Sequence, residues 1–224
     1  MKEVNSYGWK AVIGSSIGYA MDGFDLLILG FMLSLISGDL GLTTGQAGSL
    51  VTWTLVGAVI GGFIFGTLSD KFGRVRVLTW TIVLFAVFTG LCAFAQGYWD
   101  LLIYRTIAGI GLGGEFGIGM ALAAEAWPAQ HRAKATSYVA IGWQLGVLAA
   151  ALLTPVLLPY IGWRGMFMVG IIPAFVAWFF RAKLHEPEIF VQSKEIKEHS
   201  HTNSFKLLVK DVRTTKTSIG VAIL

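Results

Sequence analysis

The stretch Gly66-Thr-Leu-Ser-Asp70-Lys-Phe-Gly73-Arg74-Val-Arg76 joins two long apolar runs and carries the most informative charges of the chain. Asp70 lies at the end of the run that precedes this stretch, and Arg74 and Arg76 lie at the start of the run that follows it. Gly66 and Gly73 permit a tight, closely packed loop, because glycine has no side chain to obstruct it. If the stretch served only as a positively charged anchor, the arginines would be explained but the aspartate would not. The stretch therefore predicts a latch of ion pairs that breaks when two halves of a protein rock.

Apolar runs of membrane-spanning length occupy most of the chain. Hydrophobic residues make up 55% of the 224 residues and charged residues 13%, whereas soluble domains are about a quarter charged. A spanning helix needs about 20 mostly apolar residues. Such runs occupy residues 11–36, 46–69, 76–96, 101–126, 135–160 and 163–182. The sequence therefore predicts an all-α membrane protein with a six-helix transmembrane bundle in residues 1–182.

Residues 183–224 form two further segments that differ in composition. Residues 183–215 are charged and polar, which is typical of a linker, and residues 216–224 turn apolar again. The last seven residues are too few to cross a bilayer, so we expect them to begin a seventh helix. The interpretation is a half-length carrier whose second six-helix half is missing. His199 and His201 are two residues apart, but a solvated linker explains them better than a metal site.

Lysine and arginine gather in alternate connections between the runs. They precede the first run, separate the second from the third and the fourth from the fifth, and follow the sixth. By the positive-inside rule, the N-terminus and the segment after the sixth run are cytoplasmic. The net charge of +4 is spread over these short connections rather than along one polar face. This distribution argues against nucleic acid as a partner and favours a lipid bilayer.

Ionisable residues inside the apolar runs are the candidates for function. Asp22 and Asp25 lie near the middle of the first run, on one helix face because they are three residues apart. Arg105 and Glu115 lie in the fourth run. Charges at the bilayer centre are costly and usually face a water-filled cavity. We predict that these four residues couple transport to protons, with structural ion pairs as the alternative.

Contacts among these four charges are only partly fixed by spacing. Arg105 and Glu115 are ten residues apart, which separates them by about 15 Å along a helix, so they do not meet. The depths of Arg105 and Asp25 are compatible with a contact but do not establish one. Residues Tyr19, Trp53, Arg105, Trp143 and Gln144 are predicted to line a substrate cavity.

A string of glycines follows Arg105, at positions 109, 111, 113, 114, 117 and 119. A dinucleotide-binding loop needs a preceding strand, and here the string lies inside an apolar run. Glycines at this density instead favour close contact between helices. Cys92, the single cysteine, is interpreted as a small apolar packing residue. The chain offers no nucleophile–base pair, metal cluster or phosphate loop in a suitable context, so an enzyme is not predicted.

Several of these motifs resemble those of the major facilitator superfamily. Residues 66–76 resemble its signature loop, and Arg105-Thr-Ile-Ala-Gly109 resembles its intramembrane arginine motif. Glu125-Ala-Trp-Pro128, followed by Arg132, is similar to its cytoplasmic Glu…Arg pair, which joins the Asp70 cluster. The resemblance implies the N-terminal six-helix bundle of that fold. It also implies a cytoplasmic gate made of Gly66, Asp70, Gly73, Arg74, Arg76, Glu125 and Arg132.

Within the superfamily, the chain resembles metabolite:proton symporters for sialic acid, aromatic acids and other organic acids. The likeness rests on Asp22-Gly-Phe-Asp25, Gly113-Gly-Glu115-Phe-Gly117 and Glu125-Ala-Trp-Pro128. In carriers of this group an aspartate of such a sequence works with the arginine of the fourth helix. The resemblance implies uptake of a small anionic metabolite across a bacterial inner membrane, powered by a proton gradient without a cofactor.

Two other functions remain open at this point. One is a facilitator or exporter of the same fold, because the direction of transport is not written in the sequence. The fifth run lacks the Gly-Pro-x-x-Gly-Gly pattern of drug/proton antiporters, which lowers the case for efflux. The other is a half-length protein that transports nothing, because a complete cavity needs the helices of a second bundle.

Overall fold

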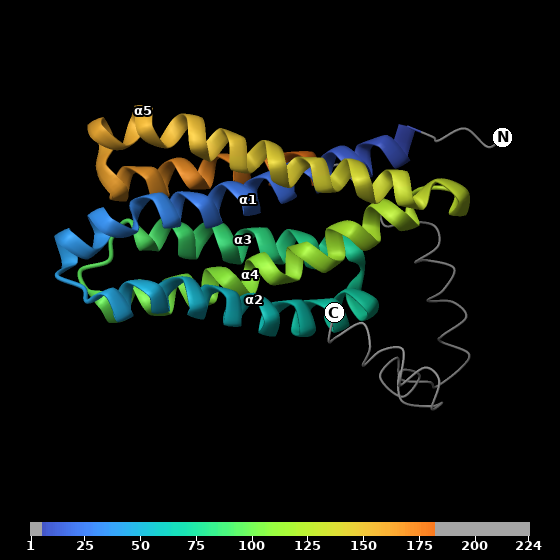
Figure 1. Cartoon of the computed structure of the whole chain (residues 1–224). Helices are drawn as coiled ribbons and strands as arrows, with labels where there is room; N and C mark the ends of the chain where they lie inside the picture. The colour runs from blue at the N-terminus through green and yellow to red at the C-terminus, as the bar shows by residue number, and fades with distance from the viewer. Residues whose placement is uncertain (1–5, 182–224) are drawn as a thin grey trace. The chain divides into compact units, whose positions relative to one another are not determined.

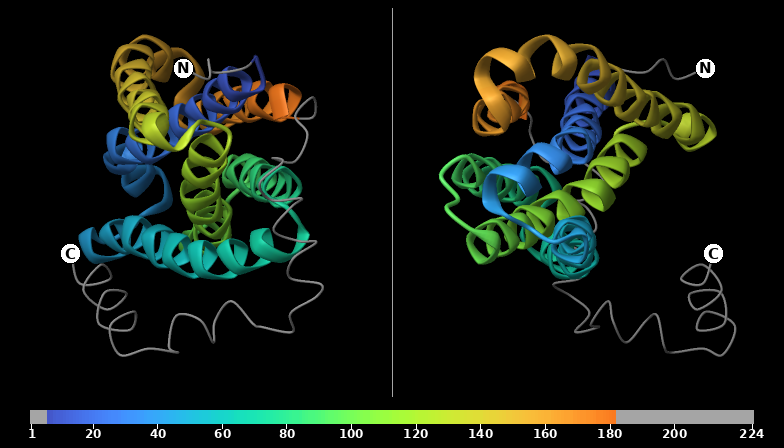
Figure 2. Two further views of the ribbon diagram at one scale, coloured as in Figure 1. Left: turned by 90° about the vertical axis from the view of Figure 1, so that its right-hand side faces the viewer. Right: turned by 60° about the vertical axis from the view of Figure 1, so that its left-hand side comes forward.

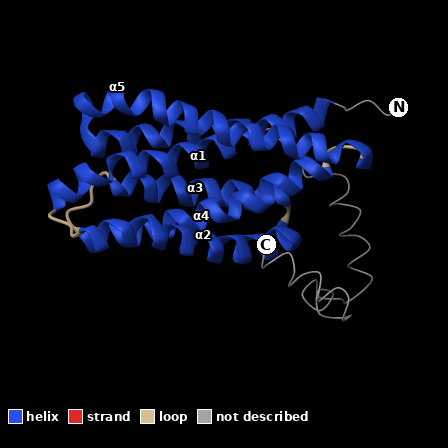
Figure 3. Cartoon of the chain, in the orientation of Figure 1, coloured by secondary structure: helices blue, strands red, loops and turns tan. Residues whose placement is uncertain are grey.

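The computed structural model describes residues 6–181, and these form a bundle of long helices with short connections (Figures 1 and 3). The helices are α1 (Ser6–Leu40), α2 (Thr44–Phe72), α3 (Arg74–Cys92), α4 (Tyr98–Glu125) and α5 (Arg132–Arg181), with a 3₁₀ turn, η1 (Ala129–His131), before α5. All five helices are long and apolar enough to cross a membrane. No strand occurs within residues 6–181.

Helix α5 contains two of the predicted spans. Its 50 residues would extend for about 75 Å as one straight helix, more than twice the apolar thickness of a bilayer. Gly162 breaks it with non-helical angles, φ 64° and ψ 179°, and the chain folds back there (Figure 1). Residues 132–161 and 163–181 are thus the fifth and sixth spans. The predicted all-α membrane bundle with six spans is confirmed, whereas the predicted linker 183–215 and seventh helix 216–224 lie outside the described residues.

Local sequence signals explain where α2 begins and ends. The Thr43 hydroxyl accepts a hydrogen bond from the Gln46 backbone, and the Gln46 side chain accepts one from the Thr43 backbone. This capping box satisfies two donors that a helix start leaves unpaired. Gly73 ends α2 with φ 111°, a conformation that residues with a side chain avoid. Gly73 therefore has the predicted turn role, but Gly66 lies inside α2, and an added Cβ there would meet nothing within 4 Å.

Glycines set the closest helix contacts, as the glycine string predicted. A Cβ added at Gly109 or Gly113 of α4 would collide with a backbone carbonyl of α2, that of Thr54 or Ala58. In the opposite direction, a Cβ added at Gly57 or Gly61 of α2 would collide with the backbone of α4, at Thr106 or Ile110. Helices α5 and α1 pack in the same way, because Gly142 and Gly146 of α5 lie against the backbone of Ser16 and Ala20. Pairs of glycines four residues apart let helices pack backbone to backbone in lipid.

The helices are not equivalent in position. Seen along the bundle, α1 and α4 run through its middle, and the second half of α5 lies beside α3 on one side (Figure 2). Helix α2 lies at the bottom of both views, and the first half of α5 lies at the top (Figure 2). The connection between α2 and α3 and the one between α4 and α5 share one end of the bundle with the start of α1 (Figure 1). We call this the basic end, because it carries Lys10, Lys71, Arg74, Arg76, Arg132 and Lys134.

Candidate functional site

The Asp25–Arg105 ion pair joins the two central helices in the interior of the bundle. Nη1 and Nη2 of Arg105 lie 3.0 and 2.8 Å from Oδ1 and Oδ2 of Asp25. The side chains of Arg105 and Asp25 are 0% and 1% exposed. The guanidinium also lies 5.9 Å from the centre of the Phe167 ring. The structure therefore makes the contact that spacing alone left undecided, with one charge-assisted hydrogen bond from Nη1 to Oδ1 and a second close charge contact between Nη2 and Oδ2.

Asp22 and Glu115 belong to a second buried group, with Tyr19 between helices α1 and α4. All three residues are buried, and both carboxyl groups lie close enough to act electrostatically on the Tyr19 phenol. The Tyr19 hydroxyl donates a hydrogen bond to the Phe116 carbonyl at 3.0 Å. Asp22 and Asp25 share one face of α1, yet they have different neighbours: a phenol in one case and a guanidinium in the other.

The predicted cavity residues separate into two sets. The Tyr19 and Trp143 rings flank Phe116, at centroid distances of 4.5 and 5.5 Å. Gln144 and Trp53 are not buried by residues 6–181, and Trp53 is 47% exposed. Phe116 was not predicted, although its place between Glu115 and Gly117 is a signal that could have indicated it. The aromatic row of Tyr19, Phe116 and Trp143 links α1, α4 and α5 beside the second acidic group.

Arg74 is the centre of an ion-pair cluster at the basic end. It contacts Asp70 at 2.8 Å and Glu125 at 3.1 Å, and it donates a hydrogen bond to the Ser69 hydroxyl at 2.6 Å. The cluster therefore ties the end of α2 and the start of α3 to the end of α4. The predicted ion pairing within the latch is present.

One predicted gate residue, Arg132, stands apart from this cluster. Arg132 is exposed and forms no ion pair within residues 6–181. Arg74 takes the partner, Glu125, that the family motif suggested for Arg132. The turn η1 separates Arg132, the first residue of α5, from the end of α4. Arg76 lies two residues beyond Arg74 on α3, and its side chain reaches the surface. Whether the cluster works as a gate stays a prediction.

The opposite end of the bundle carries a polar cluster that sequence reasoning missed. Asp39 accepts hydrogen bonds from Arg164 at 2.6 Å and from the Trp163 indole at 3.0 Å. Arg164 also donates to the Ala95 carbonyl at 3.2 Å, and its guanidinium lies 4.1 Å from the centre of the Trp163 ring. This cluster borders a hollow of about 600 Å³. It fastens α1, the α3–α4 connection and the turn of α5 together.

The remaining sequence candidates have ordinary surroundings. Cys92 is buried, and its thiol donates to the Phe88 carbonyl at 3.2 Å, as expected for a packing residue. Among the residues that the structure describes, no three or more histidine, cysteine or acidic side chains gather as a metal site would require. His199 and His201 lie outside those residues.

Buried charges between apolar helices of membrane-spanning length are features of a multi-pass membrane protein. A model described as "Major Facilitator Superfamily" matches residues 15–224. The chain therefore belongs to the major facilitator superfamily.

Individual relatives agree with this assignment. The chain is 75% identical over 227 residues to a "Putative metabolite transport protein" of Haemophilus influenzae, covering 99% of this chain and 56% of that protein. It is 41% identical to a "Probable 4-methylmuconolactone transporter" of Cupriavidus pinatubonensis, covering 80% of this chain and 42% of that one. It is 33% identical to "Sialic acid transporter NanX" of Escherichia coli, covering 86% and 48%. The chain thus spans about half the length of these curated relatives.

Solved structures share the fold. The xylose transporter XylE of E. coli, in a partially occluded inward-open conformation, superposes with a TM-score of 0.75 at 24% sequence identity. The match covers 85% of this chain and 51% of that one. At this identity the likeness concerns the fold alone.

Proposed function

We propose that this chain is half of a proton-coupled symporter that takes up a small, carboxylate-bearing metabolite by alternating access. The observation that carries the proposal is the Asp25–Arg105 ion pair, which is hydrogen-bonded and buried in the bundle. The names of several relatives support the substrate class, because cis,cis-muconate, benzoate and sialic acid are carboxylates. A charged pair inside a transporter bundle is costly and marks a proton or substrate pathway more often than a structural contact.

Charge balance explains how this pair would couple proton to substrate. In the empty state the charges of Asp25 and Arg105 cancel. A proton on the Asp25 carboxylate removes the negative charge and leaves the buried guanidinium without a counter-charge. A substrate carboxylate restores neutrality by binding Arg105. The loaded state and the empty state then have the same net charge, so each can reorient in the low-dielectric interior, whereas the half-loaded state cannot.

The second acidic group offers further proton positions. Asp22 and Glu115 are buried beside Tyr19, on the same two helices as the ion pair. We assign them the transfer of the proton between the ion pair and the basic end. The aromatic row of Tyr19, Phe116 and Trp143 offers flat apolar surfaces on which an aromatic or unsaturated acid can stack.

The two ends of the bundle would complete the transport cycle. The Arg74 cluster would hold the cytoplasmic side closed and break as the side opens inward. The N-terminus and the basic end face the cytoplasm of a bacterium in this proposal, and the protein lies in the inner membrane. The other wall of the substrate cavity comes from a second six-helix half. The proton gradient is the energy source, without a cofactor.

Uptake by cells that carry the intact gene tests this proposal against the alternatives. We expect one or more radiolabelled carboxylates, from a panel including muconate, benzoate, nicotinate and sialic acid, to accumulate above the outside concentration. Accumulation should collapse when a protonophore is added. Uptake that only equilibrates, with no effect of the protonophore, would mean a facilitator. Efflux of preloaded substrate would mean an exporter, and no movement of any compound would favour a half-length protein that does not transport.

A further inference from the structure

We propose that the face formed by α3 and the second half of α5 is a binding site for an anionic glycerophospholipid of the leaflet at the basic end. One acyl chain lies in an apolar groove between the two helices, and Arg76 binds the headgroup phosphate. This inference is independent of the substrate, because the groove lies outside the acidic groups described above.

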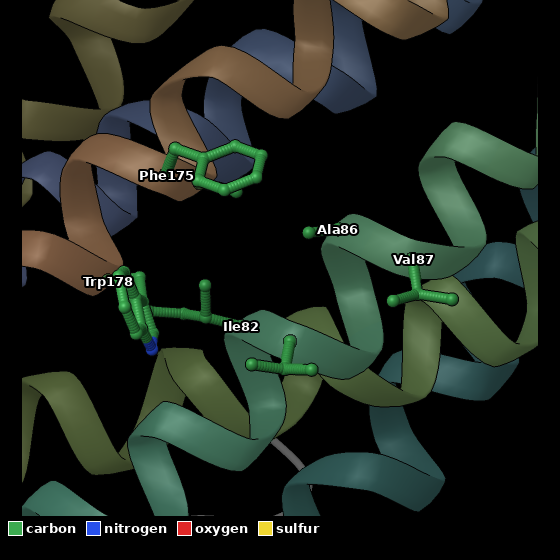
Figure 4. A pocket seen from close by; sticks show the side chains of 7 residues that line it. Ile82, Ala86, Val87, Phe175 and Trp178 are labelled. Carbon is green, nitrogen blue, oxygen red and sulfur yellow. The ribbon is translucent and has the colours of Figure 1, made fainter.

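The groove is apolar throughout its length (Figure 4). It measures about 230 Å³ and lies between the middle of α3 and the second half of α5. An added ligand here would meet hydrocarbon and the edge of one indole ring. A polar metabolite gains nothing from such a lining, whereas a hydrocarbon chain fits it. The side chains that form most of the groove are Ile82, Val83, Ala86, Val87, Phe175 and Trp178.

A continuous stripe on α3 leads from this groove to the basic end. Arg76, Trp80, Val83 and Val87 follow one another at spacings of four, three and four residues, which places them on one helix face. All four side chains are exposed. The order along the stripe is cation, indole and then aliphatic side chains. That order matches a phospholipid from its phosphate through its glycerol region to its acyl chain, because indole rings favour the interface and cations attract anionic headgroups.

The length of the stripe fits one leaflet. Arg76 and Val87 are eleven residues apart, so they are about 16 Å apart along the helix. The apolar core of a bilayer is about 30 Å thick, and half of it is about 15 Å. The stripe therefore begins near the headgroup level, and the groove at its inner end lies nearer the bilayer centre. The alternative occupant of this face is a second copy of the chain. Such a contact would not require a cation at one end, whereas an anionic lipid would, so Arg76 is the reason that we assign the face to a lipid.

A second cation strengthens the headgroup end. Lys71 is exposed at the end of α2, and its Nζ lies 5.4 Å from the centre of the Phe72 ring. The Phe72 ring in turn lies 5.8 Å from that of Trp80. Lys71 is thus held on the aromatic patch beside the stripe. Because Arg76 is the cation on the stripe itself, the phosphate contact is assigned to Arg76 with help from Lys71.

Native mass spectrometry of the full protein, purified from its own membrane, tests the site. Equal amounts of phosphatidylglycerol and phosphatidylcholine are added, and the bound fraction of each is measured. We expect phosphatidylglycerol to be preferred. Arg76→Gln should lower this preference about fivefold, the effect of one cation near a headgroup. Ala86→Phe, which fills the groove, should lower binding of both lipids about tenfold, as expected for the loss of about two buried methylene groups.

Two matched variants serve as controls. Lys134→Gln removes an exposed cation of the same end, and Val156→Phe enlarges an exposed apolar side chain of the first half of α5. Neither should change lipid binding. The proposal is overturned if the controls lower binding as much as the test variants, or if the two lipids bind equally to the wild type. A doubled protein mass that Ala86→Phe abolishes would assign the face to a second copy instead. If either test variant elutes as an aggregate, Trp178→Ala, expected to weaken both lipids, replaces it.

Discussion

The Asp25–Arg105 pair and the Arg74 cluster use the same chemistry in opposite surroundings. The first is fully buried, whereas the side chains of Arg74, Asp70 and Glu125 are 17%, 37% and 23% exposed. A buried pair that loses one partner leaves an uncompensated charge, which is strongly destabilising. An ion pair that water reaches can open at little cost. The difference suits the interior pair to a role in which each proton must be matched by a substrate charge. It suits the end cluster to repeated opening.

The largest effect is expected when the buried pair is broken. Asp25→Ala leaves the Arg105 guanidinium buried with no counter-charge and should cost roughly 3–5 kcal/mol of stability. The measurement is the temperature at which the purified full-length protein loses its monodisperse elution profile.

A double variant sharpens this first prediction. Asp25→Ala combined with Arg105→Met removes both charges and should recover most of the lost stability, since replacing a buried pair by apolar groups is often neutral. The double variant should still be inactive in transport. Equal destabilisation by the single and double variants would show that lost packing, not the unpaired charge, causes the effect.

The middle of the bundle and the basic end also differ in how closely neighbouring helices approach their glycines. Gly113→Ala places a Cβ against the Ala58 carbonyl and should destabilise the protein by about 1–3 kcal/mol, the usual cost of overpacking. Gly66→Ala adds a Cβ where residues 6–181 leave open space, so helix propensity should make it neutral or slightly stabilising. Thermal melts of the two variants compare them directly. A destabilising Gly66→Ala would reveal a neighbour from outside residues 6–181.

A smaller effect is expected at the basic end itself. Glu125→Gln removes one of the two carboxylates around Arg74, and it should cost no more than about 1 kcal/mol. Because water and salt reach this cluster, the difference from wild type should shrink between low and high ionic strength. Melts at the two salt concentrations measure it. A salt-independent loss as large as that of Asp25→Ala would remove the distinction between the two regions.

The smallest effect is expected at the opposite end of the bundle. Asp39 and Arg164 are about half exposed, so Asp39→Asn should barely change the melting temperature. The amide side chain of this variant keeps a carbonyl oxygen that can accept the hydrogen bonds from Arg164 and the Trp163 indole. A large drop in melting temperature would mean that this cluster, rather than the interior pair, is the main polar brace of the bundle.

The spans were predictable because a bilayer imposes a minimum length on every apolar helix. The break at Gly162 falls between the fifth and sixth predicted runs, and the glycine string did mark close contacts. Partners across helices were harder to predict. Rotation about each helix axis decides whether Arg105 meets Asp25, and this rotation depends on packing that spacing does not encode.

The contacts of some predicted residues differ from those that the motifs suggested. Arg132 resembled a member of the Asp70 cluster by motif, yet it is Arg74 that reaches Glu125. Gly66 belongs to the same motif but has no close neighbour within residues 6–181. The contact between Asp39 and Arg164 was not predicted, because 125 positions separate them in sequence and no local pattern joins them. A motif is a local pattern, so it does not specify which side chains from distant parts of the chain come into contact.

Comparing exchange with accumulation in Asp25→Asn vesicles tests the central claim most directly. The full-length protein is reconstituted, and carboxylate accumulation under an imposed proton gradient is compared with exchange between equal concentrations on the two sides. Asp25→Asn keeps the shape of the side chain but cannot carry the proton. The account predicts that accumulation is lost while exchange continues, because Arg105 still binds the substrate carboxylate. Accumulation equal to that of the wild type would contradict the assignment of the Asp25–Arg105 pair to proton coupling.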